Sequence, residues 1–213
     1  LLNLAIPPKK YVDYEALEES RNALAELDRL NAGQIISKED RAREKADYKR
    51  FFSISGKHLV FYSERSGFYR YYQDIIETLL KKTSVRIHYV TNDPNDQIFR
   101  VAEKEPRILP YYISIKKMVT LMMRLECDIF VMTTPDLDNF YLKRSLMKKD
   151  IEYIYVPHDP SSMHMSFREH ALDNFDTVFM TGPHIRDEIR ATEKLYGTKE
   201  KTLVEFGYPL MDT

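Results

Sequence analysis

Short hydrophobic runs alternate with amphipathic segments along the chain from about residue 57 onward. The runs are rich in β-branched and aromatic residues, as buried strands are. They predict strands at residues 58–62, 85–90, 108–113, 127–132, 151–156, 177–180 and 202–206. Apolar positions at helical spacing between them predict helices at residues 68–82, 115–125, 138–148 and 183–196. This alternation is typical of an α/β domain, a parallel sheet with helices on both faces.

Residues 1–56 follow a different pattern and predict a separate N-terminal segment. After an extended lead-in that contains adjacent prolines, apolar residues at helical spacing favour a helix over residues 13–33. Ser37 followed by Asp40 resembles a capping box and predicts a second, charged helix. We interpret the two helices as a hairpin that precedes a domain at residues 57–213. The sequence leaves open whether the hairpin binds a partner or a membrane, or only packs on the domain that follows.

A dense polar loop follows the predicted strand at residues 151–156. Pro157 ends that strand, and His158 and Asp159 come directly after it. In open parallel sheets, ligands bind in the crevice outside the carboxyl ends of the strands, so we expect chemistry in this loop. Histidine titrates near neutral pH, and His158 is therefore a candidate general base. Asp159 could orient His158, or could only cap the loop.

Two further turns could receive an anion through free backbone N–H groups at the start of a helix. One contains Ser66 and Gly67, after the first predicted strand, and the other contains Gly182 and His184. The alternative for Ser66 and Gly67 is an ordinary strand-to-helix turn. The chain lacks the glycine pattern of dinucleotide sites and a complete P-loop. We therefore predict neither a dinucleotide enzyme nor a nucleoside triphosphatase.

Three histidines follow one another at intervals of six residues: His158, His164 and His170. A spacing of six does not place side chains on one face of a helix, and no H-E-x-x-H pattern accompanies them. The ligand spacings of known zinc sites are also missing. The sequence therefore predicts no metal site, and we expect no cofactor.

The charge balance, the cysteine content and the lengths of the apolar runs bear on the partners and the location expected of the protein. The 213 residues contain 32 Lys and Arg against 33 Asp and Glu, so no nucleic-acid partner is predicted. The single cysteine, Cys127, cannot form an internal disulfide, which fits a cytoplasmic protein. No apolar run reaches the roughly 18 residues of a transmembrane helix. The chain lacks an initiator Met and ends in a turn-like sequence, so we expect it to be part of a longer protein.

Several short motifs occur together in the second half of the chain. They are Pro157-His158, Ser162-Met163-His164, Phe175-Asp176-Thr177-Val178-Phe179, Gly182-Pro183-His184 with Glu188-Ile189, and Leu203-Val204-Glu205-Phe206-Gly207-Tyr208. With these motifs, residues 57–213 resemble the CDP-glycerol glycerophosphotransferase family, the enzymes of teichoic-acid and capsule polymers. The resemblance implies a Rossmann-like domain that forms the N-terminal, acceptor-side half of a GT-B architecture. The donor-binding C-terminal domain of the family would then be absent from this chain.

The resemblance also implies an activity. The whole enzyme would transfer glycerol phosphate from CDP-glycerol to a lipid-linked glycan acceptor, working in the cytoplasm as a peripheral protein at the inner face of the cell membrane. His158 matches the histidine that serves as base in the family, although the residues from Asp159 onward replace the family's Gly-Thr-Pro. The residues expected to line the acceptor cleft are Ser66, Gly67, Ser162 and His164.

One further expectation follows from this interpretation, and two alternatives to it stay open. The chain by itself should show little or no transferase activity, because the donor CDP-glycerol would bind to the missing half. A nucleotide-sugar 2-epimerase-like enzyme of the same GT-B architecture is one alternative. A non-catalytic binding or assembly domain, in which His158 is only a loop residue, is the other.

Overall fold

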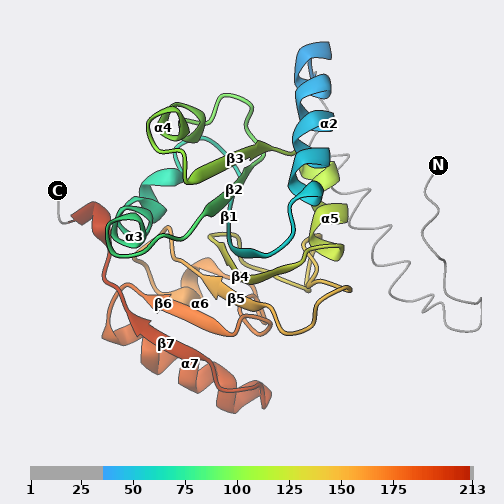
Figure 1. Ribbon diagram of the computed structural model, residues 1–213. Helices are drawn as coiled ribbons and strands as arrows, with labels where there is room; N and C mark the ends of the chain where they lie inside the picture. The colour runs from blue at the N-terminus through green and yellow to red at the C-terminus, as the bar shows by residue number, and fades with distance from the viewer. Residues whose placement is uncertain (1–35, 212–213) are drawn as a thin grey trace, which may run out of the picture. The chain divides into compact units, whose positions relative to one another are not determined.

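The computed structural model describes residues 36–211, which belong to one compact unit that begins at Ile36. The helix expected at residues 13–33 lies outside the described residues. Figure 1 shows how the helices and strands are arranged. In chain order they are α2 (Lys38–Ser53), β1 (Lys57–Ser63), α3 (Tyr69–Lys82), β2 (Ile87–Thr91), α4 (Ile98–Lys104), β3 (Ile108–Tyr112), α5 (Ile115–Met123), β4 (Cys127–Met132), β5 (Glu152–Tyr155), α6 (Met163–Ser166), β6 (Thr177–Met180), α7 (Pro183–Tyr196), β7 (Thr202–Glu205) and the 3-10 turn η2 (Pro209–Met211).

The strands form one parallel sheet in the order β3-β2-β1-β4-β5-β6-β7. This order confirms the Rossmann-like sheet that the sequence predicts. The chain first moves from β1 outward to β2 and β3, then crosses to the other side of β1 and continues from β4 to β7. The direction of winding therefore reverses between β1 and β4. In open parallel sheets, ligands bind at the carboxyl ends of the strands at such a reversal.

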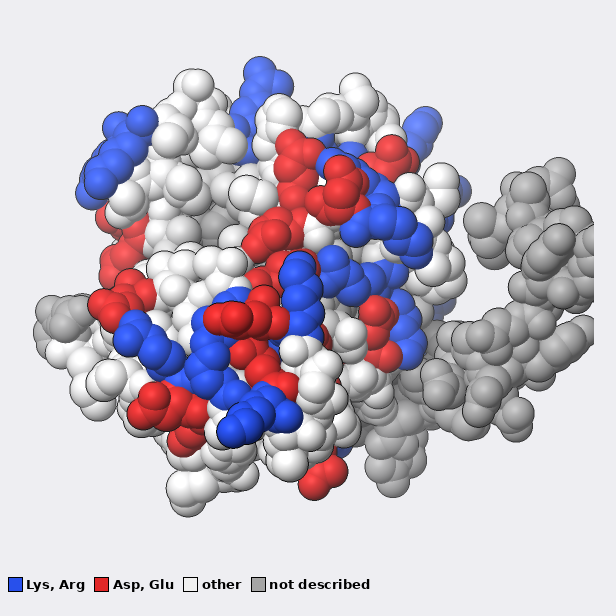
Figure 2. All heavy atoms as spheres, turned by 90° about the horizontal axis from the view of Figure 1, so that it is seen from below, with Lys and Arg blue, Asp and Glu red and all other residues white. Residues whose placement is uncertain are grey.

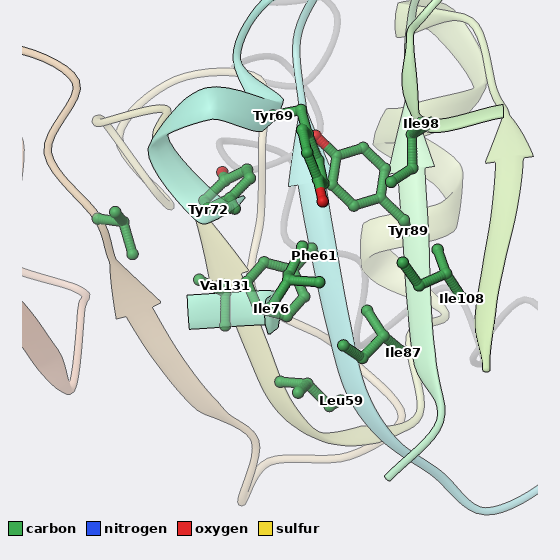
Figure 3. Close-up of a cluster of buried hydrophobic side chains, with 11 residues drawn as sticks. Leu59, Phe61, Tyr69, Tyr72, Ile76, Ile87, Tyr89, Ile98, Ile108 and Val131 are labelled. Carbon is green, nitrogen blue, oxygen red and sulfur yellow. The ribbon is translucent and has the colours of Figure 1, made fainter. Parts of the chain in front are cut away.

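Buried side chains pack against both faces of the sheet. On one face, Figure 3 shows Tyr72 and Ile76 of α3 beside Phe61, Ile87 and Tyr89 of the two strands below. All five side chains are fully buried. Figure 1 places α3 and α4 on this side of β1, β2 and β3, and α2 and α5 on the other. Helices cover both faces, as the sequence predicts.

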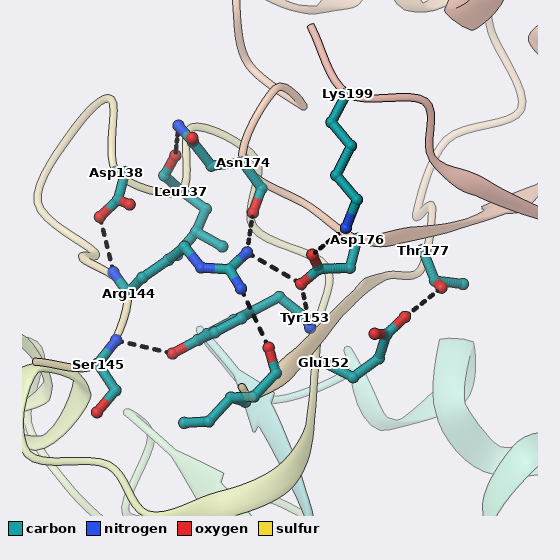
Figure 4. Close-up of polar contacts among 11 residues, drawn as sticks. Leu137, Asp138, Arg144, Ser145, Glu152, Tyr153, Asn174, Asp176, Thr177 and Lys199 are labelled. Atoms are coloured by element: carbon teal, nitrogen blue, oxygen red, sulfur yellow. Dashed lines mark hydrogen bonds and ion pairs between the residues drawn. The ribbon is translucent and has the colours of Figure 1, made fainter. Parts of the chain in front are cut away.

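The connection between β4 and β5 departs most from the predicted elements. No helix forms at residues 138–148, and this segment consists of turns and bends. Arg144 holds the turns: its guanidinium donates to the carbonyl of Asn174 at 2.7 Å and pairs with Asp176 at 2.9 Å (Figure 4). The N–H of Arg144 donates to the carboxylate of Asp138 at 2.7 Å. The prediction of a helix is wrong because such side-chain acceptors compete with the helical hydrogen-bond ladder.

The helix that the sequence assigns to a segment at residues 1–56 packs on the sheet. The predicted cap is confirmed, since the Ser37 hydroxyl accepts a hydrogen bond from the N–H of Asp40 at 3.0 Å. α2 begins directly after Ser37, at Lys38. Phe51 of α2 is fully buried and meets the ring of Tyr111 edge-on, with centroids 5.2 Å apart. α2 therefore belongs to the α/β unit, which begins at Ile36 and not at residue 57. This agrees with the alternative in which the helix packs on the domain that follows.

Two carboxylates of α2 cover the outer edge of β3. The Asp47 carboxylate accepts from the N–H of Tyr112 at 2.9 Å, and the Glu44 carboxylate accepts from the N–H of Ser114 at 2.8 Å. Pro110 has no N–H to leave unpaired, which explains why a proline is tolerated in this strand. An edge strand otherwise presents N–H groups that another chain can pair with. Here α2 supplies the acceptors and closes this edge of the sheet.

Replacing Asp47 with alanine should therefore destabilise the protein. The variant removes the acceptor of the Tyr112 N–H. Asp47 is only 9% exposed, so the contact that is lost is a buried one. A buried unpaired donor costs about 1–3 kcal/mol, and the free energy of unfolding should fall by that amount in urea titrations followed by circular dichroism. Lys45→Ala, on the exposed side of the same helix, is the control and should leave stability within about 0.5 kcal/mol. Equal stability of Asp47→Ala and the wild type would show that the helix does not close this edge.

His88 of β2 is a buried histidine on the α2 side of the sheet. It is 3% exposed, its ring stacks on Tyr111 with centroids 5.9 Å apart, and its Nδ1 lies 3.0 Å from the Tyr111 hydroxyl. Burial lowers the pKa of His88 to about 4, and the positive charges of Lys57, Arg50 and Arg86 act in the same direction. The imidazole is therefore neutral in the folded protein at pH 7.

Acidification should weaken the fold through His88. The histidine takes up a proton near pH 6.5 in the unfolded chain but only near pH 4 in the folded one, so the unfolded state binds more protons between these values. The free energy of unfolding should consequently fall as the pH falls through this window, by up to about 3 kcal/mol for this group. His88→Gln does not titrate and should lose less stability between pH 7 and about pH 4.5 in urea titrations. The same loss in both proteins would contradict this assignment.

Candidate functional site

His158 lies in the loop after β5, at the carboxyl edge of the sheet. Its half-buried ring stacks on Phe68, with centroids 5.4 Å apart, and meets the edge of Tyr71 at 6.0 Å. The hydroxyl of Tyr208 donates to the carbonyl of His158 at 3.2 Å. The chain segments after β1, β5 and β7 therefore converge on this histidine, although they are far apart in the sequence.

A backbone carbonyl fixes the tautomer of His158. The Nδ1 atom lies 3.1 Å from the carbonyl oxygen of Thr133, directly after β4. A carbonyl oxygen can only accept a hydrogen bond, so Nδ1 carries the proton of the neutral ring. Nε2 then holds a free lone pair, which is the group that a general base needs. The histidine at the position expected of a catalytic base is thus held in the tautomer whose Nε2 accepts protons.

The contact that orients His158 comes from Thr133, not from Asp159. The Asp159 carboxylate accepts from the N–H of Ser161 at 2.8 Å and lies in an exposed turn. Hydrogen bonds from Ser161 lower the pKa of Asp159, and the nearby His158 adds a smaller effect. Asp159 therefore caps its own loop, the second of the two roles that the sequence allows.

The turn that contains Ser66 and Gly67 reaches His158 through Phe68. Gly67 has a φ of 90°, a backbone conformation that favours glycine. The N–H of Ser66 donates to the carboxylate of Asp93, after β2, at 3.2 Å. This carboxylate takes the N–H group that a bound anion would need, so the geometry fits an ordinary strand-to-helix turn.

Ser162 and His164 belong to a different part of the surface. Ser162 directly precedes α6, and its side chain makes no capping hydrogen bond. His164 lines a cavity of about 470 Å³ between α6 and α7, together with His170. The wall of this cavity does not include His158. His164, which was expected to line the acceptor cleft, therefore lies in the wall of a cavity that does not include His158.

Gly182 and His184 lie at the start of α7. Gly182 has an extended φ, and the ring of His184 folds back over it, because a Cβ at Gly182 would lie 2.9 Å from the His184 Nδ1. β6, which precedes them, pairs with β5, the strand that leads into the His158 loop. These two residues therefore lie next to the His158 loop along the sheet edge. The ring of His184 occupies the space over Gly182 at the start of α7.

A smaller cavity, of about 190 Å³, lies at the carboxyl ends of β1 and β4, where the winding of the sheet reverses. Glu64 directly follows β1, and Thr134 follows the threonine whose carbonyl holds His158. The same two strand ends thus build the cavity and orient the histidine. The lining residues are Glu64, Thr134, Pro135, Asp136, Phe140, Tyr141, Leu142 and Arg168.

Several polar groups in this wall are buried. Thr134 is 8% exposed, and its hydroxyl oxygen has no hydrogen-bond partner among the described residues. Burial raises the pKa of Asp136, and Arg168, at 4.0 Å from its carboxylate, partly opposes this effect. Burial, followed by the charge of Glu64, raises the pKa of Tyr141, so its phenol stays protonated. Asp136 also has a φ of 65°, which is uncommon for a residue with a side chain.

In residues 36–211, no group of three or more His, Cys, Asp or Glu side chains is placed to hold a metal ion. None of the helices there combines the length and apolar character needed to cross a membrane. Burial raises the pKa of the Cys127 thiol to about 12, which keeps it protonated. On the face seen in Figure 2, basic and acidic side chains are intermingled. In α7, Arg190 and Glu193 form an ion pair at 2.6 Å.

Comparison with known proteins adds no relative to this picture. No family model, no curated protein and no solved structure matches the chain. The functional argument therefore depends on the residues, on their geometry and on the resemblance that the sequence motifs carry.

The tautomer of His158 can be measured directly. In NMR spectra of the histidine ring nitrogens, neutral His158 should carry its proton on Nδ1, because the Thr133 carbonyl accepts from that atom. His164, which is exposed, provides the comparison in the same spectrum. A neutral His158 ring protonated on Nε2 would contradict the contact and would remove the lone pair expected of a base.

Proposed function

We propose that this protein is the acceptor-side part of a transferase that moves glycerol phosphate from CDP-glycerol to a hydroxyl group of a lipid-linked glycan. The observation that carries the proposal is the imidazole of His158, held through Nδ1 by the Thr133 carbonyl at the carboxyl edge of a parallel sheet. The Rossmann-like sheet is the architecture expected of one half of a GT-B enzyme. The reaction itself is inferred from the family that residues 57–213 resemble.

In the proposed reaction, the acceptor oxygen attacks the phosphorus atom that bears glycerol, and Nε2 of His158 takes the hydroxyl proton. The new O–P bond replaces the bond to the CMP group, which leaves with the electron pair. The Thr133 carbonyl continues to accept from Nδ1–H after the ring becomes positively charged, which stabilises the imidazolium. These steps need one base on the side of the site that binds the acceptor, and His158 is that base.

A lipid-linked acceptor would bring the protein to the inner face of the membrane as a peripheral protein. On the α6–α7 side, two large apolar side chains are exposed: Met165 of α6 is 86% exposed and Leu195 of α7 is 74% exposed. Leu195 also lines the larger cavity between these helices.

Substitution of His158 tests the proposal. In the natural full-length protein, His158→Ala should lower kcat for transfer of labelled glycerol phosphate from CDP-glycerol by about 10²–10⁴-fold, the usual contribution of a positioned base. His158→Phe keeps an aromatic ring against Phe68 and Tyr71 but has no proton acceptor. It should therefore lose activity to the same extent with less effect on stability.

The control for both variants is His164→Ala, because His164 lies in the separate cavity between α6 and α7. This variant should keep the wild-type kcat. If His158→Phe is as active as the wild type, His158 is not the base. If the full-length wild-type protein transfers no glycerol phosphate at all, the binding or assembly domain becomes the better reading.

A further inference from the structure

We propose that Tyr208, which follows β7, is a positioning residue for His158: its phenol holds the backbone of the histidine, so that the imidazole keeps its contact with Thr133. The inference rests on the proposed function, because it concerns the residue that serves there as the base. It gives a role to a side chain that the sequence does not single out as part of the site.

A hydrogen bond joins Tyr208 to the backbone of His158. The Tyr208 hydroxyl donates to the His158 carbonyl at 3.2 Å, and the carbonyl oxygen can only accept. Burial raises the pKa of Tyr208, and the nearby Tyr71 and Asp159 raise it further. The charge of Arg70 opposes these effects in part. The phenol therefore keeps its proton at neutral pH and remains a donor to His158.

Tyr71 of α3 is a neighbour that both residues share. Its ring centroid lies 6.0 Å from that of His158 and 6.4 Å from that of Tyr208. Tyr71 is itself fixed, because it is buried and its hydroxyl accepts from the guanidinium of Arg70 at 2.8 Å. A displacement of the Tyr208 ring would therefore also disturb an aromatic contact of His158.

The chain turns back after β7 and so brings Tyr208 to His158. Gly207 has a φ of 77°, a conformation that favours glycine, and its N–H donates to the Met180 carbonyl at 3.0 Å. After Tyr208, the N–H of Met211 donates back to the Tyr208 carbonyl at 2.9 Å. Figure 1 shows this last, red segment of the described chain beside α3. Tyr208 is therefore held on both sides along the chain.

The hydroxyl of Tyr208 can affect the chemistry only through His158. The Thr133 carbonyl lies 3.1 Å from Nδ1 and leaves Nε2 to accept the proton of a substrate hydroxyl. If the backbone of His158 moves, this contact weakens and the neutral ring can take the other tautomer, in which Nε2 carries the proton and is not a base. A base displaced by about 1 Å can lose about 10²-fold in rate.

NMR spectra of the histidine ring nitrogens test the positioning role without any transfer reaction. Tyr208→Phe removes the hydroxyl but keeps the ring beside Tyr71. In the full chain, the ratio of the Nδ1–H to the Nε2–H tautomer of neutral His158 should fall by at least about threefold, as expected for the loss of one hydrogen bond. Circular dichroism shows whether the variant is folded. An unchanged ratio in the folded variant would overturn the assignment.

Two further variants accompany Tyr208→Phe in these spectra. Gly207→Ala keeps the phenol but strains the turn that places it, because a residue with a side chain disfavours a φ of 77°. It should change the His158 tautomer ratio in the same direction. Tyr196→Phe is the control, because the ring of Tyr196 contacts His170, with centroids 4.1 Å apart. If Tyr196→Phe changes the His158 ratio as much as Tyr208→Phe does, the effect is not specific to Tyr208 and the assignment fails.

Kinetics distinguish a positioning residue from one that binds substrate. In the natural full-length protein, Tyr208→Phe should lower kcat for glycerol phosphate transfer by about tenfold and leave KM for the acceptor within about twofold. The reason is that the base loses its position whereas no contact to the substrate is removed. A higher KM with an unchanged kcat would show that Tyr208 binds the substrate, and would overturn the positioning role.

The outcomes also separate this inference from the proposed function. If the tautomer ratio responds to Tyr208→Phe but the full-length wild type transfers no glycerol phosphate, the proposed function fails and the positioning of His158 by Tyr208 stands. If His158→Phe abolishes transfer while Tyr208→Phe changes neither the tautomer ratio nor kcat, the positioning role alone fails.

Discussion

The pairing of β1 with β4 is the constraint on which the rest of the structure depends. Leu59 pairs with Ile129 in parallel register, so two strands separated by two complete βα units must lie side by side. This pairing sends β2 and β3 to one side and β5, β6 and β7 to the other. It also brings the residues after both strands together, among them Glu64 and Thr134. The candidate site therefore exists only after a long-range contact has formed, and such contacts slow folding.

The irregular connection between β4 and β5 shapes the cavity at the ends of this strand pair. A helix would direct its side chains radially from one axis, whereas the observed turns bring Asp136, Tyr141 and Leu142 to the wall of one cavity. Arg144 maintains the turns through its contacts to the segment before β6. The cavity therefore depends on two connections at once, one after β4 and one after α6, which also supplies Arg168.

Local pattern was sufficient for the strands, since β-branched and aromatic runs predict each of them, including β3 despite Pro110. The same pattern did not reveal α4, which has only seven residues, and it predicted a helix at residues 138–148 that does not form. In the site, the position of His158 after a strand was informative. Its orienting partner was not predictable, because a backbone carbonyl such as that of Thr133 leaves no trace in residue identity. The approach of Arg168 to Asp136 likewise depends on tertiary structure alone.

The two margins of the sheet differ, because α2 covers β3 with the carboxylates of Glu44 and Asp47. In the described part of the chain, β7 ends the sheet at the other margin without a strand beyond it. Two copies of this unit could align their β7 strands around a twofold axis, and that pairing would use the open margin of each. Neither copy would then have an open sheet margin with which a third copy could pair. Sheet extension between molecules would consequently stop at a closed dimer and could not propagate into a fibril.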